Sequence, residues 1–269
     1  MSEPAIDIMP DIRSLITEDE TPVDNLPSEK QQRLLTEPLY SAWTGPGAGR
    51  TFLAAANVGV FAQVRNPAIV PEMFLSLDVE VAQDWWRKEH RSYFVWEFGK
   101  PPDLVLEIVS NTEGDEEGGK KDKYARMRVD YYVIYDPLRQ VLPEVVTVYG
   151  LRHGVYERQA GARFPLLKLG LVLWDGTFEG KHDTWLRWTD EDGGLISTSR
   201  ERAEQEHQRA EQAHQQAEQE HQRAEQAHQQ AEQERQRAEQ GERLVAQERQ
   251  RAERLAALLR RSGIDPDQA

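Results

Sequence analysis

Residues 102–137 read PDLVLEIVSNTEGDEEGGKKDKYARMRVDYYVIYDP, and this stretch decides the fold. Residues 104–109 are apolar on both faces apart from Glu107, which is typical of a central strand buried on both sides. An acidic, glycine-containing loop follows, and then a short basic helix at 120–127 and a second apolar strand at 131–135. A strand, a helix and a strand within about thirty residues predict a βαβ unit.

Glu107 is the residue that this layout has to explain, because burying a carboxylate is costly unless it is paired or coordinates a metal. A satisfied structural ion pair is one explanation. Asp103 lies on the same face of the strand but roughly 13 Å away, so the two acids cannot share one ion. A partner must come from a neighbouring element. A preceding strand offers Glu72, and the helix offers Lys120 or Lys121.

Two acids and a lysine are the groups that metal-assisted phosphodiester hydrolysis requires. Carboxylates hold Mg²⁺, which lowers the pKa of the attacking water and clamps phosphate oxygens. A lysine orients the water or stabilises the developing charge. The spacing therefore suggests a phosphodiesterase site, with the structural ion pair as the alternative.

The run PDLVLEIVS, the acidic loop, a lysine four residues before a tyrosine (Lys120 and Tyr124) and the run YYVIYDP resemble the Uma family of restriction-type endonucleases. This family is placed in the PD-(D/E)xK nuclease superfamily. The resemblance covers about residues 30–190, and members with a long tail rich in Ala, Glu and Gln resemble the chain beyond 200. It implies an α/β fold with a mixed sheet flanked by helices, and cleavage of DNA with Mg²⁺ or Mn²⁺ as the cofactor.

The resemblance also implies roles for individual residues. Glu107 matches the second acid of the family and Lys120 matches the lysine, which here sits on the helix, since Val109 stands where the usual spacing wants it. Glu72 matches the first acid, with glutamate in place of aspartate. The candidate metal ligands are Glu72 and Glu107, and the candidate catalytic residues are Glu107, Lys120 and Asp103. Strand geometry favours an outer-shell or strand-start role for Asp103.

These residues predict a divalent-metal-dependent endonuclease that hydrolyses DNA phosphodiester bonds. The alternative is a catalytically weakened nuclease fold that serves as an interaction module presented by a coiled coil. The changed first acid and the net charge of −14 favour that alternative. The charge is unevenly distributed, because residues 30–188 hold 21 acidic and 20 basic side chains. A basic cluster over 120–128 is either a contact for DNA or an ordinary solvated helix face.

The amino-acid composition indicates in which kind of cellular compartment the protein is found. The chain of 269 residues has no cysteine, which excludes disulfides and thiolate metal sites and favours a reducing compartment. No apolar run approaches the length of a membrane span. The sequence therefore predicts a soluble, cytoplasmic protein without membrane contact.

Four segments are expected along the chain. Residues 1–29 are an acidic, proline-containing arm expected to be disordered, and residues 30–198 form the nuclease domain. Residues 199–261 form a heptad-repeat helix or coiled coil, and residues 262–269 form a tail. Within the domain, Ser28 is expected to cap a helix at 28–35 that Pro38 ends, with strands at 39–43 and 93–98.

The heptad segment repeats RAEQEHQ-like units with alanine every seven residues from Ala203 to Ala238. A strict period of seven predicts a helix that can supercoil with a partner, and homo-oligomerisation through this helix is possible. Histidines recur from His207 to His228 on one stripe. Seven residues of helix rise about 10.5 Å, so two of these histidines cannot share a metal ion.

Overall fold

The computed structural model describes residues 25–47, 49–64, 67–110 and 115–261. The expectations for 1–24 and for the tail at 262–269 lie outside the described residues. The chain divides into two units, Met1–Ala203 and Glu204–Ala269, which are described separately.

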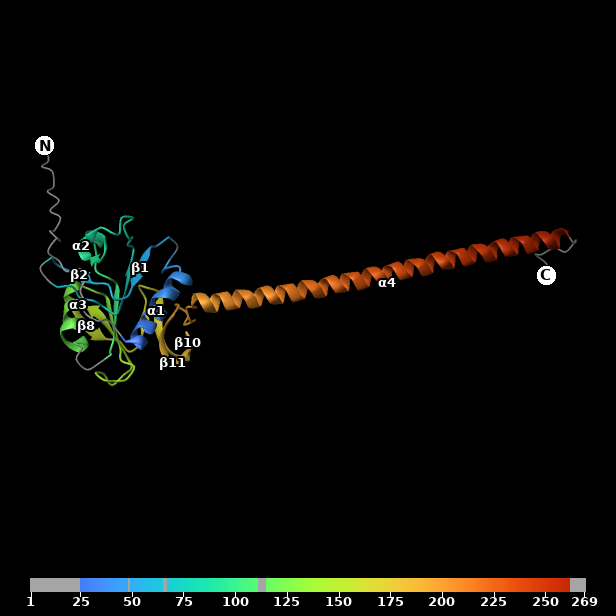
Figure 1. The fold of residues 1–269 in the computed structure, drawn as a ribbon. Coiled ribbons are helices and arrows are strands. Elements are labelled where there is room, and N and C mark those ends of the chain that lie inside the picture. Colours follow the sequence, from blue (N-terminus) through green and yellow to red (C-terminus); the bar gives the residue numbers. More distant parts are fainter. Residues whose placement is uncertain (1–24, 48, 65–66, 111–114, 262–269) are drawn as a thin grey trace, which may run out of the picture. The chain divides into compact units, whose positions relative to one another are not determined.

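A six-stranded mixed sheet forms the centre of the first unit (Figure 1), as the sequence predicts. Its order is β1-β3-β5-β6-β7-β8, and only β5 and β6 are parallel. The strands are β1 (Phe52–Ala55), β3 (Met73–Leu77), β5 (Leu104–Ile108), β6 (Tyr131–Tyr135), β7 (Val146–Arg152) and β8 (Val155–Arg158). Every residue of β3, β5 and β6 is buried, which explains their apolar sequences.

The connection from β5 to β6 contains the helical segment expected between two parallel strands. A kinked helical segment, η2 (Glu116–Lys120), runs directly into α3 (Lys121–Met127), and its backbone is non-helical at Gly118, with φ of −108° and ψ of −110°. The helix ends at Arg128, which takes a left-handed conformation with φ of 69°. In the sheet, Glu107 lies opposite Ile134.

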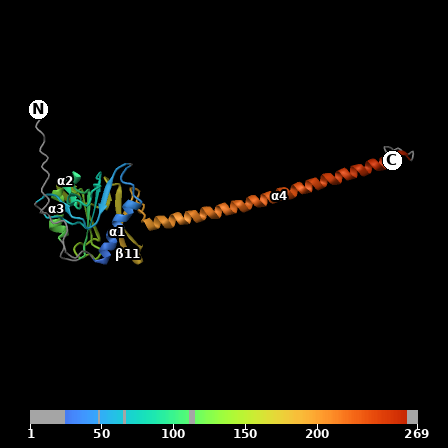
Figure 2. The ribbon, with the colours of Figure 1, turned by 45° about the horizontal axis from the view of Figure 1, so that its top comes forward.

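Two apolar layers sandwich the central sheet. On one face, α1 (Leu26–Ser41) and the sheet of β9 (Arg163–Phe164), β10 (Leu169–Phe178) and β11 (Lys181–Thr189) enclose a core that includes Leu35, Leu106 and Trp188. Figure 2 shows α1 beside β11. The other face packs against α3 and a smaller layer with η1 (Lys88–His90), the parallel pair β2 (Val60–Phe61) and β4 (Tyr93–Phe94), and α2 (Val95–Phe98).

The first helix is longer than the sequence predicts, and the strand expected at 39–43 is wrong. Asn25, not Ser28, is the N-cap, and its side-chain oxygen accepts the Ser28 amide at 2.9 Å. The helix continues through Pro38 to Ser41. Leu35 and Leu39, one turn apart, are both fully buried, and this packing outweighs the helix bond that a proline cannot make.

The strand expected at 93–98 is also only partly correct. Tyr93 and Phe94 form β4, but the chain then turns into α2 and leaves it through Gly99 with φ of 73°. The Tyr93 and Phe98 rings stack with centroids 4.3 Å apart, which stabilises this helical turn after the short strand.

The long helix α4 (Ser199–Arg261) fulfils the expectation of a C-terminal helix. It begins with a reciprocal capping arrangement, in which the Glu201 amide donates to Thr198 Oγ1 and the Thr198 amide donates to Glu201 Oε2. Arg187 of β11 holds the same Glu201 carboxylate through two bonds of 2.8 and 2.7 Å. Within the described ranges, no helix combines the length and the apolar content needed to cross a bilayer.

Candidate active site

Glu107, near the end of β5, has no solvent exposure, and two side chains from the following helical segment bind its carboxylate. Lys120 Nζ lies 3.0 Å from Glu107 Oε2, and the Tyr124 hydroxyl donates to Oε1 at 2.7 Å. Both carboxylate oxygens are therefore engaged by groups that lie 13 and 17 residues away in sequence. The buried acid is paired, as its position in an apolar strand requires.

The local sequence explains why Lys120 and Tyr124 reach the same carboxylate. They are four residues apart where η2 joins α3, so their side chains lie on one face of the helix. Tyr124 is fully buried and anchors that face against the sheet.

Burial and the charge of the partner act in opposite directions on the pKa of Glu107 and on the pKa of Lys120. Burial raises the pKa of Glu107 above its ordinary value, and the charge of Lys120 and the hydrogen bond from Tyr124 only partly offset this. Burial lowers the pKa of Lys120, but the nearby carboxylates outweigh it and leave that pKa raised. The ammonium thus stays charged, and it compensates the carboxylate at the end of the strand.

Glu116 is a third acid at this site, and the analysis of the sequence missed it. Its side chain is 7% exposed, and Oε1 lies 3.5 Å from Lys120 Nζ. Its other oxygen, Oε2, is buried without a hydrogen-bond partner among the described residues. A buried acceptor left unsatisfied calls for a water or an ion. The available signal was the spacing of four residues from Lys120 on one helical turn.

Glu72 lies at the same end of the sheet as Glu107. Strands β3 and β5 are antiparallel, with Met73 opposite Leu106, so the register continued by one residue sets Glu72 opposite Glu107. Directly opposed residues share a face of the sheet. The carboxylate of Glu72 is one of the charges that raise the pKa of Lys120, and Gln32 Nε2 of α1 donates to Glu72 Oε2 at 2.7 Å.

Asp103 and Lys121 lie elsewhere. Asp103, at the start of β5, accepts Lys100 Nζ at 2.8 and 2.6 Å and the Leu77 amide at 2.7 Å. The Lys121 ammonium sits 3.8 Å from the centroid of the Tyr149 ring and does not reach Glu107. The fold therefore brings Glu72, Glu107 and Lys120 together and leaves Asp103 at the opposite end of the strand.

The donor chemistry of this end of the sheet suits a hard cation, because it consists of carboxylate oxygens. Among the residues that the structure describes, no three His, Cys, Asp or Glu side chains converge closely enough to hold a metal by themselves. Mg²⁺ often binds to only one or two carboxylates and takes its remaining ligands from water and substrate phosphates. Glu72 and Glu107 fit that mode, and Glu116 adds a third carboxylate whose Oε1 lies 3.5 Å from Lys120 Nζ.

Comparison with known proteins assigns the family. No curated protein and no solved structure matches the chain. Residues 17–173, more than half of the 269, match the Uma2 family, whose description is "Putative restriction endonuclease". The match includes the whole βαβ unit and every candidate residue named above. The chain therefore belongs to the Uma2 family.

Proposed function

We propose that this protein is a divalent-metal-dependent endonuclease that hydrolyses DNA phosphodiester bonds. The observation that carries the proposal is the buried contact between Glu107 and Lys120, with Glu72 in register on the adjacent strand. Membership of a family described as restriction endonucleases supports a nuclease in general. The nature of the metal and of the substrate belongs to the proposal.

Each residue has a distinct role in this proposal. Glu72 and Glu107 would hold the cation, which when bound supplies a more acidic water and neutralises charge on the phosphate. Lys120 presents a fixed ammonium to a phosphate oxygen as negative charge develops. Tyr124 fixes the rotamer of Glu107, since its hydroxyl binds Oε1 at 2.7 Å. Asp103 is a strand-start residue that acts through the backbone of β3 rather than on the substrate.

The surface beside the site carries positively charged side chains, which can contact the phosphates of DNA. Lys123 and Arg126 are exposed on α3, the helix that contains Tyr124, and Arg128 is exposed where it ends. Exposed lysine and arginine side chains bind phosphates without reading sequence. We therefore expect the duplex to lie across α3, with binding that weakens as salt increases.

The direct test is a nicking assay on supercoiled plasmid with Mg²⁺ or Mn²⁺. Purified protein is compared with Glu107→Gln and Lys120→Met variants whose circular dichroism and melting temperature match the wild type. Nicking that needs the metal and disappears in both variants would support the assignment. Cleavage that persists in both variants would mean that other residues, or a contaminant, carry the activity.

A second candidate function rests on α4. Leu255 and Leu258 are 54% and 60% exposed near the end of this 63-residue helix. Apolar side chains on a heptad-repeat helix are typical of pairing with another helix. If the nuclease site is weakened, the folded domain would act as an interaction module held in a homo-oligomer by α4. Sedimentation equilibrium of the full chain and of a Leu255→Glu/Leu258→Glu variant tests this: a monomeric wild type would refute it.

A further inference from the structure

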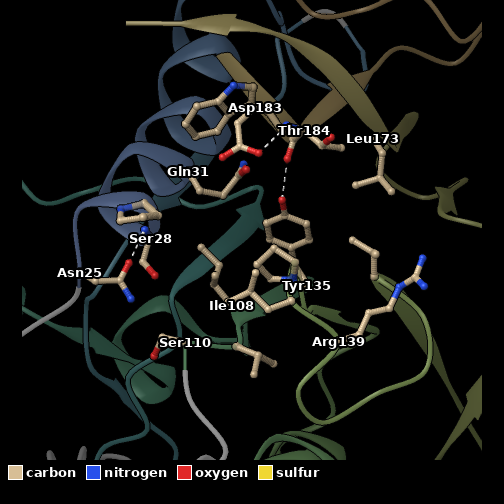
Figure 3. A pocket seen from close by; sticks show the side chains of 16 residues that line it. Asn25, Ser28, Gln31, Ile108, Ser110, Tyr135, Arg139, Leu173, Asp183 and Thr184 are labelled. Carbon is tan, nitrogen blue, oxygen red and sulfur yellow. Dashed lines mark hydrogen bonds between the residues drawn. The ribbon is translucent and has the colours of Figure 1, made fainter. Parts of the chain in front are cut away.

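A cavity of about 610 Å³ opens at the carboxyl ends of the two parallel strands, β5 and β6. Ile108 and Tyr135 line it from these strands (Figure 3). Trp185 lines it from β11. Its volume lies within the usual range for small-molecule sites, about 300–1,000 Å³. The carboxyl ends of parallel strands are the common location of ligand sites in α/β sheets.

The cavity adjoins the candidate active site across the thickness of the sheet. Glu107 and Ile108 are consecutive residues of β5, so their side chains point to opposite faces. Glu107 meets Lys120 and Tyr124 on one face, whereas Ile108 forms part of the cavity wall on the other. The same strand end therefore presents a candidate catalytic carboxylate and a cavity about one residue apart.

Hydrogen bonds within the protein hold two aromatic side chains of the cavity wall in place. The Tyr135 hydroxyl donates to the Thr184 carbonyl at 2.9 Å, and Trp185 Nε1 donates to the Gly176 carbonyl at 3.1 Å. Burial also raises the pKa of Tyr135 to about 12, so this hydroxyl stays protonated. Both rings are thus fixed before any ligand arrives, which reduces the entropic cost of binding.

A rigid turn brings Arg139 to the same cavity. The buried Asp136 carboxylate accepts the amides of Gln140, Val141 and Leu142 at 2.7 to 2.9 Å and so fixes the loop after β6. Arg139 has φ of 52°, a left-handed conformation that is unfavourable for arginine. Strain of this kind persists where surrounding bonds enforce it, and it is concentrated at functional sites.

The residues that line the cavity indicate which chemical class of ligand it would bind. Apolar and aromatic walls carry a few polar groups, and the guanidinium of Arg139 and the hydroxyl of Ser28 have no hydrogen-bond partner among the described residues. One cation, Arg139, and one anion, Asp183, leave the lining without net charge. A phosphate would lack a cluster of cations, and an aliphatic chain would leave the polar groups unpaired. A nucleobase has apolar faces and hydrogen-bonding edges, and it suits this lining.

We infer that this cavity is a binding pocket for one unpaired nucleobase of the DNA strand whose phosphate lies at Glu107. The inference rests on the proposed function, because the strand bound at Glu107 is what delivers the base. Taking a base out of a duplex costs a few kcal/mol, and least where the base is already unpaired. The enzyme would therefore prefer DNA that contains a bulged or otherwise unpaired base near the cleaved bond.

The test uses a duplex with one bulged 2-aminopurine and a fully paired duplex of the same sequence, both in EDTA so that no cleavage occurs. We expect the protein to bind the bulged duplex about tenfold more tightly and to change the 2-aminopurine fluorescence. The Leu173→Trp substitution places a large ring on the cavity wall, on a strand position that is 40% exposed and tolerant of change. It should remove the preference and the fluorescence change.

Two further variants keep the outcome interpretable. Leu166→Trp makes the same change at a leucine that is 60% exposed and does not line the cavity, and it should behave as the wild type. Arg139→Ala removes the partnerless guanidinium without filling the cavity and should weaken binding of the bulged duplex alone. Equal affinity of the wild type for the two duplexes, or a preference unaffected by Leu173→Trp, would overturn the inference.

Failure of the pocket and failure of the nuclease assignment give different results. Plasmid nicking without any preference for the bulge refutes the pocket only. A preference for the bulge that Leu173→Trp removes, in a protein that does not nick DNA, refutes the nuclease only. Binding of free 2-aminopurine deoxyriboside without any binding of DNA would assign the cavity to a soluble nucleoside and overturn the inference as stated.

Discussion

One acid stands immediately before strand β5 and another lies near its end, and the two have opposite surroundings. Asp103, at its start, is partly exposed and bound by Lys100, three residues earlier, and by the Leu77 amide of the adjacent strand. Glu107, near its end, is fully buried and bound by Lys120 and Tyr124. The partners of Asp103 are a lysine three residues earlier and a backbone amide of β3. Those of Glu107 come from a helix, and beside them lies an acid with an unsatisfied oxygen.

The difference separates a structural carboxylate from one suited to chemistry. A carboxylate paired with a nearby lysine and a backbone amide holds two strands in register. Burial makes the ionised form of Glu107 less favourable, and a fixed ammonium and a second acid lie beside it. Such an arrangement suits a charged ligand and is not explained by stability alone. Four predictions test this contrast, starting with the largest expected effect.

Neutralising the two acids should affect catalysis unequally. Glu107→Gln removes a proposed metal ligand while keeping the shape of the side chain, and plasmid nicking should fall by on the order of 10²–10³-fold. Asp103→Asn should reduce nicking by less than about tenfold, because this residue acts only through β3. Initial rates at saturating Mg²⁺ measure both. Equal losses would contradict the division of roles.

Asp103 should contribute to the stability of the fold. Asp103→Ala leaves the buried amide of Leu77 without an acceptor and should cost about 1–3 kcal/mol of unfolding free energy in urea. The matched control is Asp78→Ala, which removes an exposed ion pair with Arg50 and should cost less unfolding free energy than Asp103→Ala, because solvent screens that pair. Losses of the same size at Asp103 and Asp78 would argue against a structural role for Asp103.

Two neighbouring glutamates sharpen the comparison on the helical side. Glu116→Gln alters the acid whose buried oxygen has no described partner, and we expect Mn²⁺ affinity in the presence of DNA to fall about tenfold. Glu117→Gln changes the next residue, which pairs with Lys121 and the Tyr149 hydroxyl, and should leave that affinity unchanged. Isothermal titration calorimetry distinguishes the two. An unaltered affinity in Glu116→Gln would exclude this acid from the metal site.

The smallest effect concerns pH. Burial raises the pKa of Glu107 in the folded protein, so the folded state binds more protons than the unfolded state above pH 4.5. The unfolding free energy of the wild type should therefore decrease relative to Glu107→Gln as pH rises above about 4.5. Lys120 stays charged throughout this window because its pKa is raised. Urea titrations at several pH values measure the difference, and a constant offset would contradict the shift.

The sequence by itself determined the βαβ unit and the long C-terminal helix, whereas the mixed sheet followed from the family resemblance. Residues 104–108 and 131–135 are apolar on both faces, and such runs have few alternatives to central strands. The seven-residue repeat of α4 likewise specifies a helix without reference to the rest of the chain. The anomaly of a buried acid at Glu107 was visible for the same reason, since it interrupts one of those runs.

Only the tertiary structure decided which groups meet Glu107. Strand order and register are set by side-chain packing between distant segments, so the alignment of Glu72 with Glu107 could not be fixed by spacing alone. Pro38 remains inside α1 because Leu35 and Leu39 are buried by other elements. The partnerless oxygen of Glu116 and the cavity beyond Ile108 are likewise products of packing. Local sequence encodes the elements, whereas the contacts between them depend on how their surfaces fit.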